Sequence, residues 1–167
     1  MPQIALPQPG RPYVTVEAAG DSDVLALDPA SIAALYRHHG AILLRGFGAD
    51  VASFGSFARQ FCATSVVNES PGREPLDPVG GVWSVNAGGE AFALHPELSR
   101  QPWKPDAALF ACLSDSENDG ATTICDGIEL VRALPDEVRR GLAARRLLYA
   151  APASPGVLAY WLGDAEP

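Results

Sequence analysis

The sequence predicts an α+β fold in a single domain. Its 167 residues, of which 47% are hydrophobic and 19% charged, suffice for one globular domain with a buried core. Short segments rich in β-branched and aromatic residues, typical of strands, alternate with segments whose apolar residues have helical spacing. Since no internal repeat divides the chain, we expect residues 1–167 to form one domain.

The first fifty residues predict a strand, a helix and a second strand. Residues 13–17 contain β-branched and aromatic side chains, which favour a strand. Asp28 is a suitable helix N-cap, Pro29 suits the first helical position, and Gly40 should end the helix. Residues 41–45 are a nearly continuous apolar run between glycines, which predicts a core strand covered on both faces.

A second helix and a long loop are expected next. Asp50 can cap a helix on which Phe54, Phe57 and Phe61 recur at helical spacing. We interpret this aromatic stripe as core packing rather than a ligand site. Residues 69–81 are punctuated by proline and glycine, which predicts an irregular loop of the length that often covers an active site.

The rest of the chain predicts mostly strands, followed by two helices. The expected strands are short apolar or β-branched runs at residues 82–85, 91–95, 107–113 and 121–125. One helix should follow Asp126, and another should begin near Pro135. Four arginines on and after that last helix are expected to form a solvated face: Arg139, Arg140, Arg145 and Arg146.

Charge and cysteine content limit the partners. The formal net charge of -8 would repel nucleic acids and anionic membrane surfaces, so we expect a small-molecule substrate and no nucleic acid or membrane partner. Cys62, Cys112 and Cys125 are too few for a disulfide framework and form no Cys-x-x-Cys pair. With no recognisable targeting or membrane-spanning segment, the chain is expected to be cytoplasmic.

His95 and Glu97 are the candidate metal ligands. In a strand, residues two apart point to the same face, so the two side chains could lie side by side. Pro96 between them cannot donate a ladder hydrogen bond, which predicts a strand edge or end. One carboxylate and two histidines form the facial triad of non-haem iron oxygenases. A histidine and a glutamate two apart also occur by chance, without any metal.

The surroundings of this pair, in order, resemble a known family. The segments are FALHPELS at 92–99, PDAALFACL at 105–113, DGATTICDG at 119–127 and Leu-Pro at 134–135. Together they resemble the metal-binding block of the TauD/TfdA oxygenases. Upstream, GAILLRGF at 40–47 is similar to an early apolar strand of that family. The resemblance extends from about residue 35 to about residue 150.

The resemblance implies a double-stranded β-helix, or jelly roll, of which this chain is the N-terminal portion and incomplete at the C-terminus. It further implies an Fe(II)/2-oxoglutarate-dependent dioxygenase of the hydroxylase type. His95 and Glu97 would bind Fe(II), and Thr122 would hydrogen-bond the carboxylate of the cosubstrate 2-oxoglutarate. No catalytic residue beyond the metal ligands is implied.

The substrate is a small molecule of undetermined identity. Many family members have aspartate where this chain has Glu97, and glutamate is also found in the clavaminate synthase-like branch, which hydroxylates amino acids. The resemblance to that branch implies an amino acid or a natural-product intermediate as the substrate. Asn86, Ser99 and Arg100 lie near the pair and are candidate substrate contacts, whereas Trp83 suits either a pocket or the core.

Two parts of the family's site have no counterpart here, and they leave an alternative open. No histidine follows His95, and we interpret His38 and His39 as a pair at a helix C-terminus. No arginine matches the one that binds 2-oxoglutarate in the family. The chain could therefore be a catalytically incomplete binding module, with homo-oligomerisation or a missing C-terminal half covering its exposed strand edges. A zinc site formed by His95 and cysteines is a third, weaker alternative.

Overall fold

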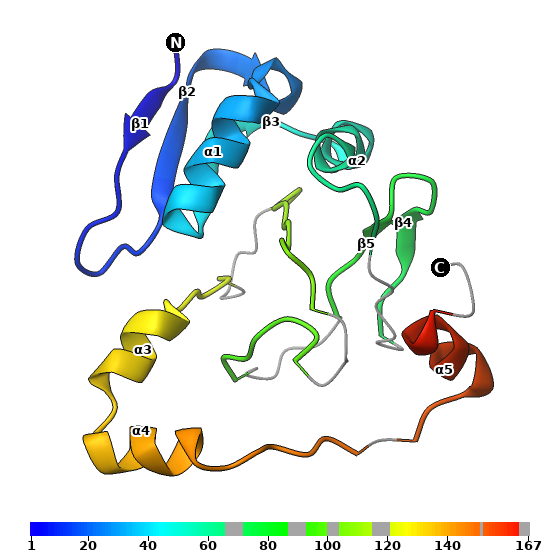
Figure 1. Cartoon of the computed structure of the whole chain (residues 1–167). Helices are drawn as coiled ribbons and strands as arrows, with labels where there is room; N and C mark the ends of the chain where they lie inside the picture. The colour runs from blue at the N-terminus through cyan, green and yellow to red at the C-terminus, as the bar shows by residue number, and fades with distance from the viewer. Residues whose placement is uncertain (66–71, 87–92, 100–103, 115–120, 151, 164–167) are drawn as a thin grey trace. The chain divides into compact units, whose positions relative to one another are not determined.

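The computed structural model describes residues 1–65, 72–86, 93–99, 104–114, 121–150 and 152–163 (Figure 1). The described residues fall into two compact units. The first unit comprises residues 1–65, 72–86 and 109–114, and the second comprises 93–99, 104–108, 121–150 and 152–163. Both contain helices, and the strands lie in the first, so the fold is α+β.

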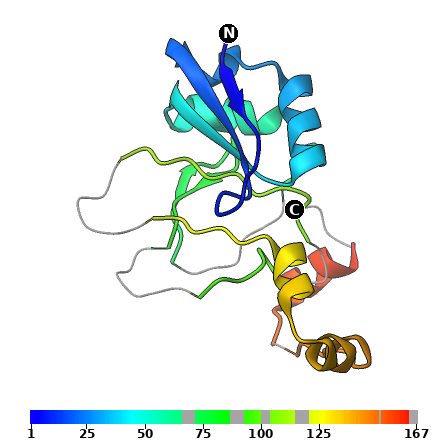
Figure 2. The ribbon, with the colours of Figure 1, turned by 90° about the vertical axis from the view of Figure 1, so that its left-hand side faces the viewer.

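A three-stranded sheet forms the centre of the first unit. Its strands are β1 (Gln3–Ala5), β2 (Val14–Asp23) and β3 (Ile42–Gly48), in that spatial order. β1 pairs antiparallel with β2, and β2 pairs parallel with β3. The parallel pair is connected through a short 3₁₀ helix, η1 (Val24–Ala26), and α1 (Pro29–His39), which lies along the sheet in Figure 2.

The capping residues of α1 are those the sequence predicts. The Asp28 carboxylate accepts hydrogen bonds from the Ser31 backbone N–H at 3.0 Å and from the Ser31 hydroxyl at 2.6 Å. These hydrogen bonds lower the pKa of Asp28. Gly40 has a φ of 78° and its N–H donates to the Tyr36 carbonyl at 2.7 Å, which ends the helix.

The core lies on one face of the sheet. It consists of Val14, Val16, Val24, Leu27, Ile32 and Phe57, and partly buried apolar side chains such as Ile42 and Leu44 pack against it. The prediction that residues 41–45 would be covered on both faces is wrong. Burial alternates along β3, and Leu43 on the opposite face is 40% exposed. The strand itself was predicted correctly, but its second face lacks a covering layer within the described part of this unit.

α2 (Val51–Arg59) confirms the second predicted helix. Asp50 and Ser53 form a capping box: the Asp50 carboxylate accepts from the Ser53 N–H at 2.7 Å, and the Ser53 hydroxyl accepts from the Asp50 N–H at 2.9 Å. Phe57 is 4% exposed, and its ring centroid lies 4.8 Å from that of Phe61. The aromatic stripe is core packing, as predicted.

The predicted loop at 69–81 contains a strand. β4 (Pro75–Asp77) pairs antiparallel with β5 (Val82–Trp83), and the Ser84 N–H extends the ladder to the Glu74 carbonyl at 2.8 Å. Residues 69–71 lie outside the described residues. The remainder of this stretch thus turns back on itself as a short hairpin, because its prolines and glycines lie at the strand start and in the turn.

The second unit is helical. Its helices are α3 (Gly127–Ala133), α4 (Asp136–Ala143) and α5 (Pro155–Leu162). Asp126 caps α3 by accepting from the N–H groups of Ile128 and Glu129, at 2.9 and 3.2 Å. The first two helices confirm the sequence prediction, and the arginines of α4 and the segment after it are exposed as expected. α5 was not predicted.

Most of the predicted middle strands are wrong. Residues 107–113 and 121–125 have no regular structure, and only Val82–Trp83 of the expected strand at 82–85 is one. Of the strand at 91–95, residues 91 and 92 lie outside the described residues and 93–95 are not in a strand. These runs have the composition of strands, but a strand also requires a neighbouring strand to form hydrogen bonds with. Among the described residues, no strand pairs with these runs. Within the same residues, no helix is long and apolar enough to cross a membrane.

Candidate metal centre

A turn, not a strand, brings His95 and Glu97 together. Residues 93–96 have no regular structure, and Glu97, Leu98 and Ser99 form a turn. His95 Nε2 lies 3.9 Å from Glu97 Oε1, and the side chains are 45% and 31% exposed. The predicted proximity is therefore found, but the predicted reason for it, a shared strand face, is wrong. Both side chains remain reachable by a ligand from solvent.

The turn is held by a lysine that the sequence analysis missed. Leu98 has a φ of 48°, which L-residues adopt rarely and at a cost of about 1–2 kcal/mol. Lys104 Nζ donates to the Leu98 carbonyl at 3.2 Å and also to the Ser99 carbonyl. These hydrogen bonds offset part of that strain. A lysine seven residues after Glu97 has no distinctive spacing by which a sequence could reveal the contact.

The ring of His95 is oriented by a backbone carbonyl. Nδ1 lies 2.8 Å from the Ala93 carbonyl oxygen. Because a carbonyl can only accept, Nδ1 must carry the hydrogen, and in the neutral imidazole the lone pair is then on Nε2, the atom nearest Glu97. Metal-binding histidines are commonly oriented in this way, by a hydrogen bond from the nitrogen that does not bind.

The two donor atoms are close to the separation that a shared metal ion requires, but not yet at it. Two atoms bound to one ion at about 2.1 Å are about 3.0 Å apart in adjacent positions and about 4.2 Å apart in opposite positions. The ligands of a facial triad occupy adjacent positions, so the observed 3.9 Å would shorten by about 0.9 Å when both side chains bind one ion. An imidazole nitrogen and a carboxylate oxygen are also the donor types that iron(II) oxygenases use.

Comparison with known protein families identifies the chain. Residues 8–157 match the sequence model of the family described as taurine catabolism dioxygenase TauD, TfdA family. The chain belongs to the TauD/TfdA family. Comparisons with curated proteins and with solved structures gave no match. Membership supports an oxygenase function of the non-haem iron, 2-oxoglutarate-dependent type.

The other predicted site residues are divided between the two units. Ser99 belongs to the same turn as Glu97. Thr122 is exposed in the irregular segment before α3, also in the second unit. Asn86 lies in the first unit, where its Oδ1 accepts from Arg73 Nε at 3.3 Å beside the β4–β5 hairpin. Arg100 lies outside the described residues. Trp83 is 45% exposed, so it is not a core residue.

The described residues supply two metal ligands and not three. They contain no cluster of three histidine, cysteine or acidic side chains that could hold a metal ion. His38 and His39 lie in the last turn of α1 with their rings edge to face, in the position predicted for a helix C-terminal pair. The three cysteines are free, and no described grouping supports a zinc site with them.

Proposed function

We propose that this chain binds Fe(II) through His95 and Glu97 in a 2-oxoglutarate-dependent dioxygenase that hydroxylates a small molecule. The observation that carries the proposal is the pair itself, within a TauD/TfdA sequence: Nε2 faces Glu97 Oε1 at 3.9 Å, and the Ala93 carbonyl holds the Nδ1 hydrogen. When bound, Fe(II) and 2-oxoglutarate supply the oxygen activation that such a hydroxylation needs.

The chain's own groups would act by binding and orientation. His95 donates the Nε2 lone pair, Glu97 contributes the negative charge that balances part of a dication, and Lys104 fixes the turn that carries Glu97. The Thr122 hydroxyl would donate to a carboxylate of 2-oxoglutarate. The exposed position of Thr122 leaves that hydroxyl accessible for such a contact.

The finer parts of the proposal follow from the resemblance. The fold would be a jelly roll, and a second histidine and an arginine would complete the site. The substrate would be an amino acid or a related natural-product intermediate, and the chain would be cytoplasmic. Ser99 and Arg100 are the proposed substrate contacts because they follow Glu97 closely in the sequence. Glu97 in place of aspartate is the feature that supports the amino acid class.

Anaerobic Fe(II) titration by calorimetry tests the ligand pair. The full chain should bind Fe(II), and both His95→Ala and Glu97→Gln should weaken binding by about tenfold or more, since each removes one of two protein ligands. His39→Ala is the matched control, because it removes an imidazole from α1 and should leave the affinity unchanged. Equal affinities of the His95→Ala and wild-type chains would contradict the assignment.

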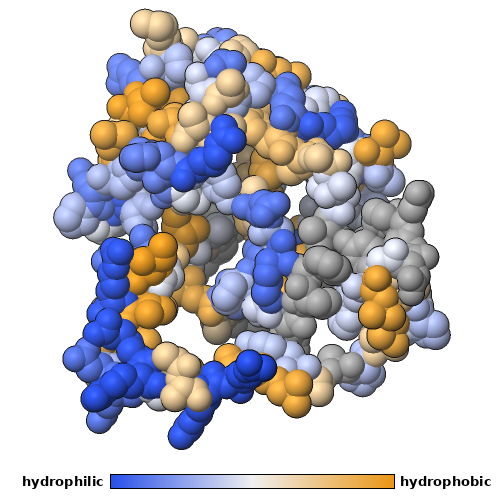
Figure 3. Space-filling model, viewed as in Figure 1, coloured by the Kyte–Doolittle hydropathy of each residue, from blue (hydrophilic) through white to orange (hydrophobic). Residues whose placement is uncertain are grey.

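A second function, that of an interaction module, is favoured by one observation. Apolar side chains on α3 and α4 are exposed: Ile128 to 65%, Val131 to 52% and Leu142 to 56%. Figure 3 shows apolar surface of this region beside the charged side chains of α4, at the lower left. Apolar surface of this kind is typical of a contact with a second copy of the chain.

Sedimentation equilibrium distinguishes this second function. A chain that works as an interaction module should form dimers that Ile128→Ser and Leu142→Ser together dissociate, whether or not Fe(II) is present. Arg140→Ser on α4 is the control, because it changes an exposed charged residue of the same helix. A monomeric wild-type chain would refute the dimer.

A further inference from the structure

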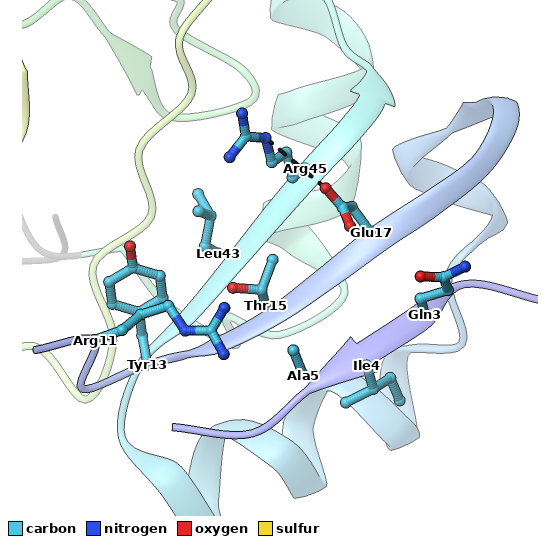
Figure 4. A pocket seen from close by; sticks show the side chains of 9 residues that line it. All are labelled: Gln3, Ile4, Ala5, Arg11, Tyr13, Thr15, Glu17, Leu43 and Arg45. Carbon is cyan, nitrogen blue, oxygen red and sulfur yellow. Dashed lines mark ion pairs between the residues drawn. The ribbon is translucent and has the colours of Figure 1, made fainter. Parts of the chain in front are cut away.

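The uncovered face of the β1–β2–β3 sheet carries a pocket of about 210 Å³. Two rows of paired residues cross this face, as Figure 4 shows. Ala5, Thr15 and Leu43 form the first row, and Gln3, Glu17 and Arg45 form the second. Arg11 and Tyr13, from the segment that leads into β2, line one side. All of these residues belong to the first unit, and neither His95 nor Glu97 is among them.

Arg11 carries a buried donor without a partner. Its Nε is inaccessible to solvent, and no described residue accepts a hydrogen bond from it. Its Nη2 donates to the Leu6 carbonyl at 2.9 Å, which holds the guanidinium group beside Thr15 in Figure 4. Leaving a buried donor of a charged group unsatisfied is destabilising, so the Arg11 side chain would gain free energy by turning to bring Nε to a ligand in the pocket.

The charges in the pocket favour an anion. Arg11 and Arg45 contribute two positive charges and Glu17 one negative charge, in a chain whose net charge is -8. Arg45 Nε lies 4.0 Å from Glu17 Oε1, with both side chains more than half exposed. An ion pair at that distance and exposure is weak, so Arg45 could turn to a stronger partner at little cost.

We propose that this pocket binds a small carboxylate, which goes beyond the oxygenase function. The planar guanidinium group of Arg11 matches a carboxylate, whose oxygens would accept from Nε once the side chain turns to expose it. The hydroxyl groups of Tyr13 and Thr15 add further donors to the lining, and Ala5 and Leu43 offer an apolar surface to a short carbon chain. A volume of about 210 Å³ is below that of pockets for drug-sized ligands, so the ligand is small.

Glutarate is a suitable probe, and Arg11 itself can report on it. In a ¹H–¹⁵N spectrum of the metal-free full chain, glutarate should shift the Arg11 Nε–H signal and give a saturable titration. Arg11→Gln should weaken binding by about tenfold or more, which corresponds to 1.4 kcal/mol. Arg37→Gln is the control, because it removes an exposed arginine of α1 in the same unit and should change the affinity less than about twofold.

A third variant keeps the proposal testable if Arg11→Gln does not fold. Glu17→Gln frees Arg45 from its ion pair and removes the one negative charge of the lining, so glutarate should bind several-fold more tightly. Weaker binding by this variant would refute the proposal, as would equal losses in Arg11→Gln and Arg37→Gln, or no saturable shift of Arg11.

Two further comparisons define the ligand class and the location. Neutral glutaramide and inorganic phosphate should each bind more weakly than glutarate; tighter binding of either would overturn the carboxylate class. His95→Ala should bind glutarate as the wild type does, because the pocket does not include His95. A loss of glutarate binding in His95→Ala would place the ligand at the metal centre and reject this pocket, while leaving the proposed oxygenase function intact.

Discussion

Phe57 should contribute more to stability than any other aromatic residue of α2. Its side chain is 4% exposed and packs in the core with Val14, Val16 and Ile32. Burying about 200 Å² of aromatic side chain at about 25 cal/mol per Å² corresponds to about 5 kcal/mol. Alanine retains a small part of this area, and the cavity left behind adds a cost. We therefore expect Phe57→Ala to lower the free energy of unfolding by about 3–5 kcal/mol.

Phe61→Ala is the matched control for this prediction. It removes the other ring of the same pair, whose centroids are 4.8 Å apart, but Phe61 is only partly buried at the edge of the core. Its loss should cost about 1–2 kcal/mol, mostly the aromatic contact and a smaller apolar area. Urea unfolding followed by circular dichroism gives both values by linear extrapolation. If Phe57→Ala cost no more than Phe61→Ala, the core described for this unit would be wrong.

Three further predictions concern helix ends and the turn of the metal centre. Gly40→Ala should destabilise the chain by about 1 kcal/mol in urea unfolding, because a φ of 78° is unfavourable for alanine. Since a Cβ at this position meets nothing within 4 Å, no steric clash adds to that cost. An unchanged urea midpoint would argue against the left-handed cap. Hydrogen bonds from Ser53 lower the pKa of Asp50, so the contribution of Asp50 to stability is complete above its ordinary pKa of 3.8 and is lost as pH falls through the lower folded value. In thermal melts at a series of pH values, Asp50→Asn should reduce the fall of the melting temperature toward acid pH. Equal falls of the melting temperature in the variant and the wild type would contradict this. Lys104→Met should weaken Fe(II) binding about tenfold in calorimetry by loosening the turn, whereas an unchanged affinity would mean that the turn holds without it.

The helices could be predicted because their signals are local. Asp28, Asp50 and Asp126 each precede a helix and cap it through N–H groups two or three residues later. A cap needs only neighbouring residues, so sequence alone defines it. α5 has a local signal too, because Ser154 precedes Pro155 as Asp28 precedes Pro29, but this signal was missed. The strongly apolar composition that follows does not distinguish a short helix from a strand.

The strands were predicted less well because pairing is not local. Residues 41–45 and 107–113 have similar apolar composition, but only the first finds a partner, in the parallel register that sets Val14 against Ile42 and Val16 against Leu44. The exposure of one face of β3 could not be predicted for the same reason, because it depends on contacts with residues distant in the sequence. An apolar run indicates that a strand can be covered on both faces, while the presence of the second layer depends on residues elsewhere.

The candidate metal centre was predictable from local sequence in one respect and not in another. A separation of two residues keeps His95 and Glu97 close in a strand and in a turn alike, so the pair was predictable although its conformation was not. What makes His95 a suitable ligand is set by the Ala93 carbonyl, which holds the hydrogen on Nδ1 and leaves the lone pair of Nε2 toward Glu97. Every residue has a carbonyl, so no side-chain motif can mark this contact. The identity of residue 93 should therefore matter less for the orientation of the His95 ring than its backbone conformation.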